Sequence, residues 1–304
     1  MNVCIGIALV MVFNILQAIS AVFLASFLQY TDTTVVLLGV FSIIGTVCFA
    51  VSVRRSKKNY LPLVAMWPYV VAINITTAVS WGSFFVAVEH IEPALSSAFI
   101  NSILPLSTIV VDRFIRRVCR ISYSEILVSI SLMVALAVTA TTVAGGYSGG
   151  RVVGMDAYAI GIFMSGACGV AMAFTNVVSK KLNDARIDAG QIMSIRFLLL
   201  IVLAAVLVDE RKFVIQVTEY WPAILFVAIV GNLIPIFSLQ MGIQRLQPAT
   251  VAFLIGLAPL IFFGIQSFSQ AISFSWMTFL CVLLTTAVIL IGTVVSTRNA
   301  KRNA

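Results

Sequence analysis

The chain has 304 residues, of which 61% are hydrophobic and only 10% are charged, and its mean hydropathy is +1.10. A soluble globular domain has about 45–50% apolar and about 25% charged residues, so this composition excludes a water-soluble globule. The net charge of +8 does not indicate a nucleic-acid partner, because the basic residues are spread over short segments between apolar runs. The chain is therefore predicted to reside in a lipid bilayer.

Ten apolar runs of helical length follow one another along the chain. Crossing the hydrocarbon as a helix takes roughly 20 apolar residues, because each backbone N–H and C=O must be satisfied within the segment. The runs lack the alternation of barrel strands, so we interpret them as helices. The first run has no basic leading region and is too long for a signal sequence, so we expect it to be retained. The predicted spans are 2–28, 34–53, 62–88, 94–113, 122–144, 156–180, 189–208, 218–243, 248–269 and 274–297.

The basic residues predict how the chain is oriented. Lys and Arg beside a span are retained on the cytoplasmic side of the membrane. With the N-terminus inside, most of the 19 Lys and Arg residues fall in cytoplasmic segments, whereas Arg151, Arg211 and Lys212 fall on the opposite side. Both termini are therefore predicted to be cytoplasmic.

Part of the sequence occurs twice. A Trp-Pro pair, a Pro-Ala pair and a further Pro recur in the same order with a slip of one residue, first as Trp67-Pro68, Pro93-Ala94 and Pro105, then as Trp221-Pro222, Pro248-Ala249 and Pro259. Five spans separate the third predicted span from the eighth, and five is odd, so the two copies should cross the membrane in opposite directions. Inverted repeats of this kind are typical of secondary transporters whose substrate site lies near the midplane between the halves.

With these residues the chain resembles the drug/metabolite transporter superfamily, and specifically its EamA-type members. The pattern of that family is matched from Glu92 to Leu106 and from Gln247 to Leu260, and Arg196-Phe197 resembles a pair that members often carry. The resemblance implies an all-α integral membrane bundle of ten transmembrane helices built from two inverted five-helix repeats. The repeats would be residues 1–145 and 156–297, followed by a basic cytoplasmic tail at 298–304.

The chain departs from the family pattern in three respects, the first of which is that the prolines of the second copy lie one residue closer together. Val40-Phe41 stands where the first repeat would carry Arg-Phe, and neither repeat has the Gly-Glu pair that often closes the fourth helix. Asp112-Arg113 and Gln266-Ser267 lie in those regions instead.

Polar side chains at membrane depth are the candidates for substrate contacts, because their burial costs free energy unless they face a cavity or a neighbouring helix. In the third span Asn74, Thr77 and Trp81 share one helical face. For each amide the alternative is a hydrogen bond between helices, worth about 0.6–2 kcal/mol. The candidate substrate-binding residues are Asn14, Gln17, Asn74, Thr77, Trp81, Asn101, Asn176, Arg196 and Asn232.

The charged candidates are few. Arg196 is the one basic residue well inside a span, where it would either bind a carboxylate or phosphate of the substrate or, as the family resemblance favours, take part in a structural pairing. No carboxylate lies at the predicted midplane, so Glu89, at the outer end of the third span, is the best available proton carrier; the alternative is a solvated helix end. The five cysteines form no Cys-x-x-Cys pair, and no metal site is predicted.

A stripe of small residues is expected to serve packing. Gly161, Ser165, Gly169 and Ala173 recur every four residues along the sixth span, which permits close approach of another helix. Pro105, Pro235 and Pro259 lie inside spans and predict kinks, either for packing or as gating points.

These observations predict a secondary transporter that moves a small polar or zwitterionic metabolite, such as an amino acid or amino-acid-derived compound, across an inner membrane by alternating access. Export is implied by the resemblance alone. The alternatives are import or exchange of a phosphorylated or nucleotide-like solute, and multidrug efflux. An intramembrane enzyme would need paired carboxylates, a His-rich cluster or an activated nucleophile at one depth, which the sequence lacks. Expected partners are the substrate and the bilayer, with no cofactor, in a monomer or homodimer.

Overall fold

In the computed structural model, which describes residues 2–55, 61–116, 123–145, 154–243, 245–246, 254–270 and 272–302, every regular element of those residues is a helix. The helices are α1 (Asn2–Phe27), α2 (Thr33–Arg55), α3 (Leu61–Ala65), α4 (Trp67–His90), α5 (Pro93–Arg116), α6 (Tyr123–Ala144), α7 (Met155–Asp184), α8 (Ala189–Ile195), α9 (Leu198–Leu207), α10 (Glu210–Phe226), the π-helix η1 (Val227–Leu233), α11 (Ile234–Ile243), α13 (Ala258–Gln266) and α14 (Trp276–Arg302).

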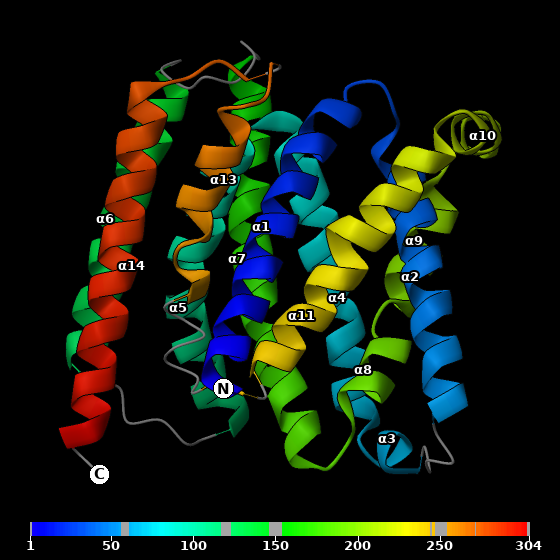
Figure 1. The fold of residues 1–304 in the computed structure, drawn as a ribbon, viewed down its shortest axis with the longest axis horizontal. Helices are drawn as coiled ribbons and strands as arrows, with labels where there is room; N and C mark the ends of the chain where they lie inside the picture. Colours follow the sequence, from blue (N-terminus) through cyan, green and yellow to red (C-terminus); the bar gives the residue numbers. More distant parts are fainter. Residues whose placement is uncertain are drawn as a thin grey trace.

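The helices lie side by side in one bundle (Figure 1). The start of α1 and the end of α14 lie at the same end of the bundle, and α4 runs in the opposite sense to the continuous stretch from α10 to α11 (Figure 1). Within the described residues, six helical stretches are long and apolar enough to cross a membrane. The prediction of an all-helical membrane protein is thus confirmed, whereas the count of ten spans and the inverted repeat stay predictions.

Several of the predicted spans are interrupted or longer than expected. The span predicted at 62–88 is divided at Met66, because Pro68 opens α4 and cannot continue the preceding turn. The span predicted at 189–208 is divided at Arg196 and Phe197. The eighth span begins at Glu210 and not at 218, because the Asp209 side chain caps the helix by accepting from the N–H groups of two following residues.

The eighth span is also irregular inside. Tyr220 has non-helical dihedral angles (φ −111°, ψ 16°) two residues before Pro222, and the chain then widens into η1. Pro235 is the second residue after η1, and its ring would clash with the carbonyl of Gly231 in a regular α-helix. A π-turn that shifts the hydrogen-bond register relieves this clash. Pro248-Ala249, at the start of the ninth predicted span, lies outside the described residues.

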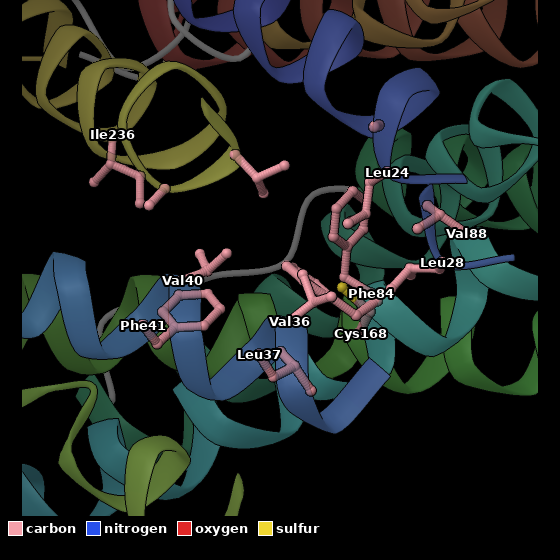
Figure 2. Packing of buried hydrophobic residues seen from close by; sticks show 14 of the residues in the cluster. Leu24, Leu28, Val36, Leu37, Val40, Phe41, Phe84, Val88, Cys168 and Ile236 are labelled. Carbon is pink, nitrogen blue, oxygen red and sulfur yellow. The ribbon is translucent and has the colours of Figure 1, made fainter. Parts of the chain in front are cut away.

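The largest buried cluster joins elements that are far apart in the sequence. Figure 2 shows Leu24 of α1, Phe41 of α2 and Phe84 of α4 in this cluster, with Ile236 of α11 across from Val40. The main helix pairs, such as α4 with α7 and α1 with α11, bring residues from before position 145 against residues from after 155. The two predicted repeats are therefore packed together along their length and do not form separate globules.

The small-residue stripe of α7 packs against α5, as predicted. The Ser165 hydroxyl lies 3.1 Å from the Ser96 hydroxyl, and a Cβ atom added to Gly169 would lie 2.9 Å from the carbonyl oxygen of Ile100. That oxygen belongs to the backbone and cannot turn away as a flexible side chain would. Glycine at this position therefore sets the distance between the two helices.

We expect Gly169→Ala to lower the free energy of unfolding by about 1–3 kcal/mol, because the added methyl group forces α5 and α7 apart. Gly82→Ala is the matched control, since it lies in α4 and a Cβ atom there would meet nothing within 4 Å. That variant should be unchanged or stabilised by roughly 0.5–1 kcal/mol. Thermal unfolding of the purified protein in detergent measures both, and equal melting temperatures would contradict the role given to Gly169.

Candidate functional site

The break between α8 and α9 is held by a side chain of α4. Arg196 and Phe197 interrupt the helix, so backbone groups beside them need partners from elsewhere. The N–H of Leu199 donates to the Asn74 Oδ1 at 3.2 Å, and the Asn74 Nδ2 donates to the Val70 carbonyl at 3.0 Å. Asn74 of α4 therefore contacts the backbone of α9, and its role in substrate binding stays a prediction.

Arg196 lies at the same break and is held by uncharged groups. Its Nε donates to the Thr77 hydroxyl at 3.3 Å, one guanidinium nitrogen lies 3.7 Å from the Met193 sulfur, and its Cζ lies 5.2 Å from the centre of the Phe197 ring. Among the described residues no carboxylate lies within ion-pair distance of Arg196. The structural pairing expected for Arg196 is thus made with a hydroxyl and a ring, which leaves its positive charge without a counter-ion in that part of the chain.

Aromatic rings cover this junction. The Phe41 ring lies 5.3 Å from the ring of Trp81, 5.3 Å from that of Phe197 and 6.0 Å from that of Phe85. Phe41 and Phe197 are fully buried and Trp81 is half-buried. Trp81 is therefore part of the packing between α2, α4 and α9, and only its uncovered part is open to a ligand.

A second group of polar side chains lies on α1 and η1. The Asn14 Nδ2 donates to the Leu254 carbonyl at 2.7 Å, and the Asn232 Nδ2 donates to the Val227 carbonyl at 2.8 Å. The side-chain oxygens of Asn14, Gln17 and Asn232 are buried and accept no hydrogen bond from the described residues. Leaving such an acceptor unpaired costs about 1–3 kcal/mol, so three of them together call for an explanation.

The other candidates lie apart from these two groups. Asn101 bonds to the Ser97 carbonyl of its own helix at 2.8 Å, and Asn176 is exposed on α7. Glu89 is half-buried and accepts a hydrogen bond of 2.6 Å from the Thr33 hydroxyl. Its role as a proton carrier stays a prediction.

One buried polar network was missed by the sequence analysis. Glu92 is only 4% exposed, and its carboxylate accepts from the Gln266 Nε2 at 2.9 Å and from the Thr278 hydroxyl at 3.5 Å. The Gln266 Oε1 accepts in turn from the backbone N–H of Ala94 at 3.1 Å. Gln266 thus ties the start of α5 to the end of α13. The sequence placed Glu92 and Gln266 at span ends but contained no signal that pairs residues so far apart.

Comparison with known proteins bears on the second half of the chain. The model of the EamA-like transporter family matches residues 159–295. This confirms the resemblance to the drug/metabolite transporter superfamily, to which the EamA-like family belongs.

A solved structure shows how far the fold extends beyond the EamA-like domain. A protein known by its crystal structure aligns with 99% of this chain and 98% of its own, with a TM-score of 0.62 and 17% sequence identity. At that identity the likeness shows the fold alone. No curated protein matches the chain.

The match to the EamA-like family points to a membrane transporter of the drug/metabolite class rather than to an enzyme, and the apolar helices suit a multi-pass membrane protein. Within the described residues no three His, Cys, Asp or Glu side chains gather as ligands for a metal ion. Of the polar side chains described above, the Arg196 guanidinium and several amides are the groups that can bind and orient a solute.

We expect Gln266→Leu to destabilise the protein by about 1–3 kcal/mol, because it leaves the Glu92 carboxylate and the Ala94 N–H without this partner in a buried place. The control is Gln29→Leu, because Gln29 bonds to the Glu89 carbonyl at an exposed position. The melting temperature of each purified variant is the measurement, and a Gln266→Leu protein as stable as the control would refute the network's contribution.

Proposed function

We propose that this protein is a secondary transporter that exports a small zwitterionic metabolite, such as an amino acid or amino-acid-derived compound, across the inner membrane by alternating access. The proposed architecture is ten transmembrane helices in two inverted five-helix repeats, residues 1–145 and 156–297, with both termini in the cytoplasm. The opposite sense of α4 and the α10 to α11 stretch supports the inversion (Figure 1).

The observation that carries the choice of substrate is Arg196. Holding a cation inside a span costs roughly 2.5–3.5 kcal/mol on insertion scales, and no described carboxylate offsets that cost here. A guanidinium presents five N–H donors, of which Thr77 uses one and the Met193 sulfur receives another weakly. The remaining donors suit one carboxylate of a substrate.

The neighbouring side chains suit the rest of such a molecule. The half-buried Trp81 offers apolar surface at the same junction, because the Phe41 ring contacts both Trp81 and Phe197, and the amides proposed as further substrate contacts carry no charge. A solute with one carboxylate, one amine and an apolar part would match this set. Helices interrupted at Arg196 and at η1 are the kind of element that builds transporter sites near the midplane.

The second candidate is exchange of a phosphorylated or nucleotide-like solute. A phosphate carries up to two negative charges and is usually held by several cations. Arg196 is the one Lys or Arg in the interior of the predicted spans, which favours the carboxylate. A multidrug exporter would depend less on Arg196. The effect of Arg196 substitutions on transport therefore distinguishes multidrug efflux from transport of a carboxylate.

Transport by proteoliposomes tests the proposal with a panel of labelled amino acids and their methyl esters. We expect at least one free amino acid to be transported and its ester, which lacks the carboxylate, to be rejected. Arg196→Gln should lower transport at least tenfold, whereas Arg196→Lys should keep part of it because the charge remains. The control is Thr218→Ala, because Thr218 is exposed and its hydroxyl donates to the Val214 carbonyl of its own helix. Equal transport by Arg196→Gln and wild type, or equal transport of acid and ester, would contradict the assignment.

The proposed topology predicts which side of the membrane two positions face. Single cysteines replacing Arg54 and Ser148, placed in a variant whose native cysteines are removed, should be labelled by an impermeant maleimide from opposite sides. Labelling of both from one side would refute the arrangement of spans. This outcome concerns the membrane topology and leaves the choice of substrate open.

A further inference from the structure

The face of α1 that carries Asn14 and Gln17 meets η1 in a fixed register. A methyl group added to Gly231 would overlap the Ser20 hydroxyl, and one added to Gly242 would lie 2.6 Å from a Val10 methyl. Residue numbers therefore rise along one helix as they fall along the other, so α1 and the η1 to α11 stretch are antiparallel. The register leaves no room for a side chain at Gly231, which holds the two backbones close.

This register turns Gln17 and Asn232 to the same flank of the contact. Gln17 precedes Ser20 by three residues on α1, and Asn232 follows Gly231 by one. With about 3.6 residues per turn, these offsets rotate both side chains away from the contact line toward one side when the helices are antiparallel. Asn14 is the i−3 neighbour of Gln17, so it extends the same side by one turn.

The groups presented on this side are acceptors. Asn14 and Asn232 each donate one of their two amide N–H groups to a backbone carbonyl, which fixes how the amide is turned and leaves the oxygen directed elsewhere. Asn14 is fully buried and Asn232 is 2% exposed, and neither oxygen receives a donor from the described residues. The Gln17 side-chain oxygen is also buried and receives no donor from the described residues.

The surroundings are neutral. No residue of α1, η1 or α11 is charged. Neutral oxygens without a carboxylate suit a monovalent cationic group, because divalent ions need carboxylates to offset their charge. Irregular helix, here η1, is also where transporters place oxygens for coupling ions.

We propose that Asn14, Gln17 and Asn232 form a subsite for a small monovalent cation, which is either the ammonium group of the cargo or a free Na⁺ ion. The inference rests on the proposed transport function, and it adds a positively charged ligand to the carboxylate assigned to Arg196. The bound cation gives all three oxygens a partner, which offsets the free-energy cost of leaving them unpaired.

The test is the thermal stability of the full-length protein in detergent, which does not require transport. Sodium chloride and methylammonium chloride are each compared with choline chloride, whose cation is too large and has no N–H donor. A ligand present at about ten times its dissociation constant should raise the melting temperature by about 3 °C. A rise with sodium identifies a free ion, and a rise with methylammonium alone identifies the ammonium group of the cargo.

Variants locate the effect. Gln17→Leu and Asn232→Leu should abolish the rise, whereas Ser102→Ala should keep it because the buried Ser102 hydroxyl bonds to the Ala98 carbonyl of its own helix. Asn232→Asp adds a negative charge, so it should enlarge the rise even where the leucine variants fold poorly. The proposal is overturned if neither cation stabilises the wild type, if the leucine variants keep the rise, or if Asn232→Asp leaves it unchanged. None of these results decides whether the protein transports a carboxylate.

Discussion

Polar groups inside a bilayer must find their partners within the protein, because the hydrocarbon offers no hydrogen bonds. This constraint explains the least regular parts of the bundle. Where α8 stops and α9 begins, Asn74 supplies the acceptor that the N–H of Leu199 would otherwise lack. Where α5 begins, Gln266 supplies one acceptor and one donor at once. Helix breaks are tolerated where another helix brings the missing partner.

The same constraint makes the remaining unpaired groups informative. Once the amides that join helices are accounted for, the groups left without a partner in the described residues are the charge of Arg196, the amide oxygens on α1 and η1, and the hydroxyls of Thr285 and Thr286 on α14. The Arg196 cation suits a negatively charged group, and the acceptor oxygens suit a positively charged one. Together they are complementary to a molecule or an ion pair that carries both signs of charge. In a chain whose second half matches the EamA-like transporter family, that complementarity favours a solute as their partner.

Local signals in the sequence located the helices but could not assign the partners of their side chains. The i, i+3 spacing of Asn74 and Thr77 correctly placed them on one face, and the structure brings both to the α8–α9 break. The sequence of α4 could not show whether the element that faces Asn74 would present a cavity or a backbone N–H group. Glu89 and Glu92 looked equivalent at the end of a span, yet only Glu92 is covered by α13 and α14, because burial depends on which distant helices pack there.

The sequence by itself determined that this protein is a helical membrane protein resembling drug/metabolite transporters, since hydropathy, charge placement and repeated prolines are properties of the chain read locally. Only the tertiary structure decided that α7 packs on α5 through Gly169, that Asn74 closes a helix break, and that Gln266 meets Glu92. These contacts join residues more than sixty positions apart. Their geometry is set by how whole helices cross, and no periodicity within one helix encodes it.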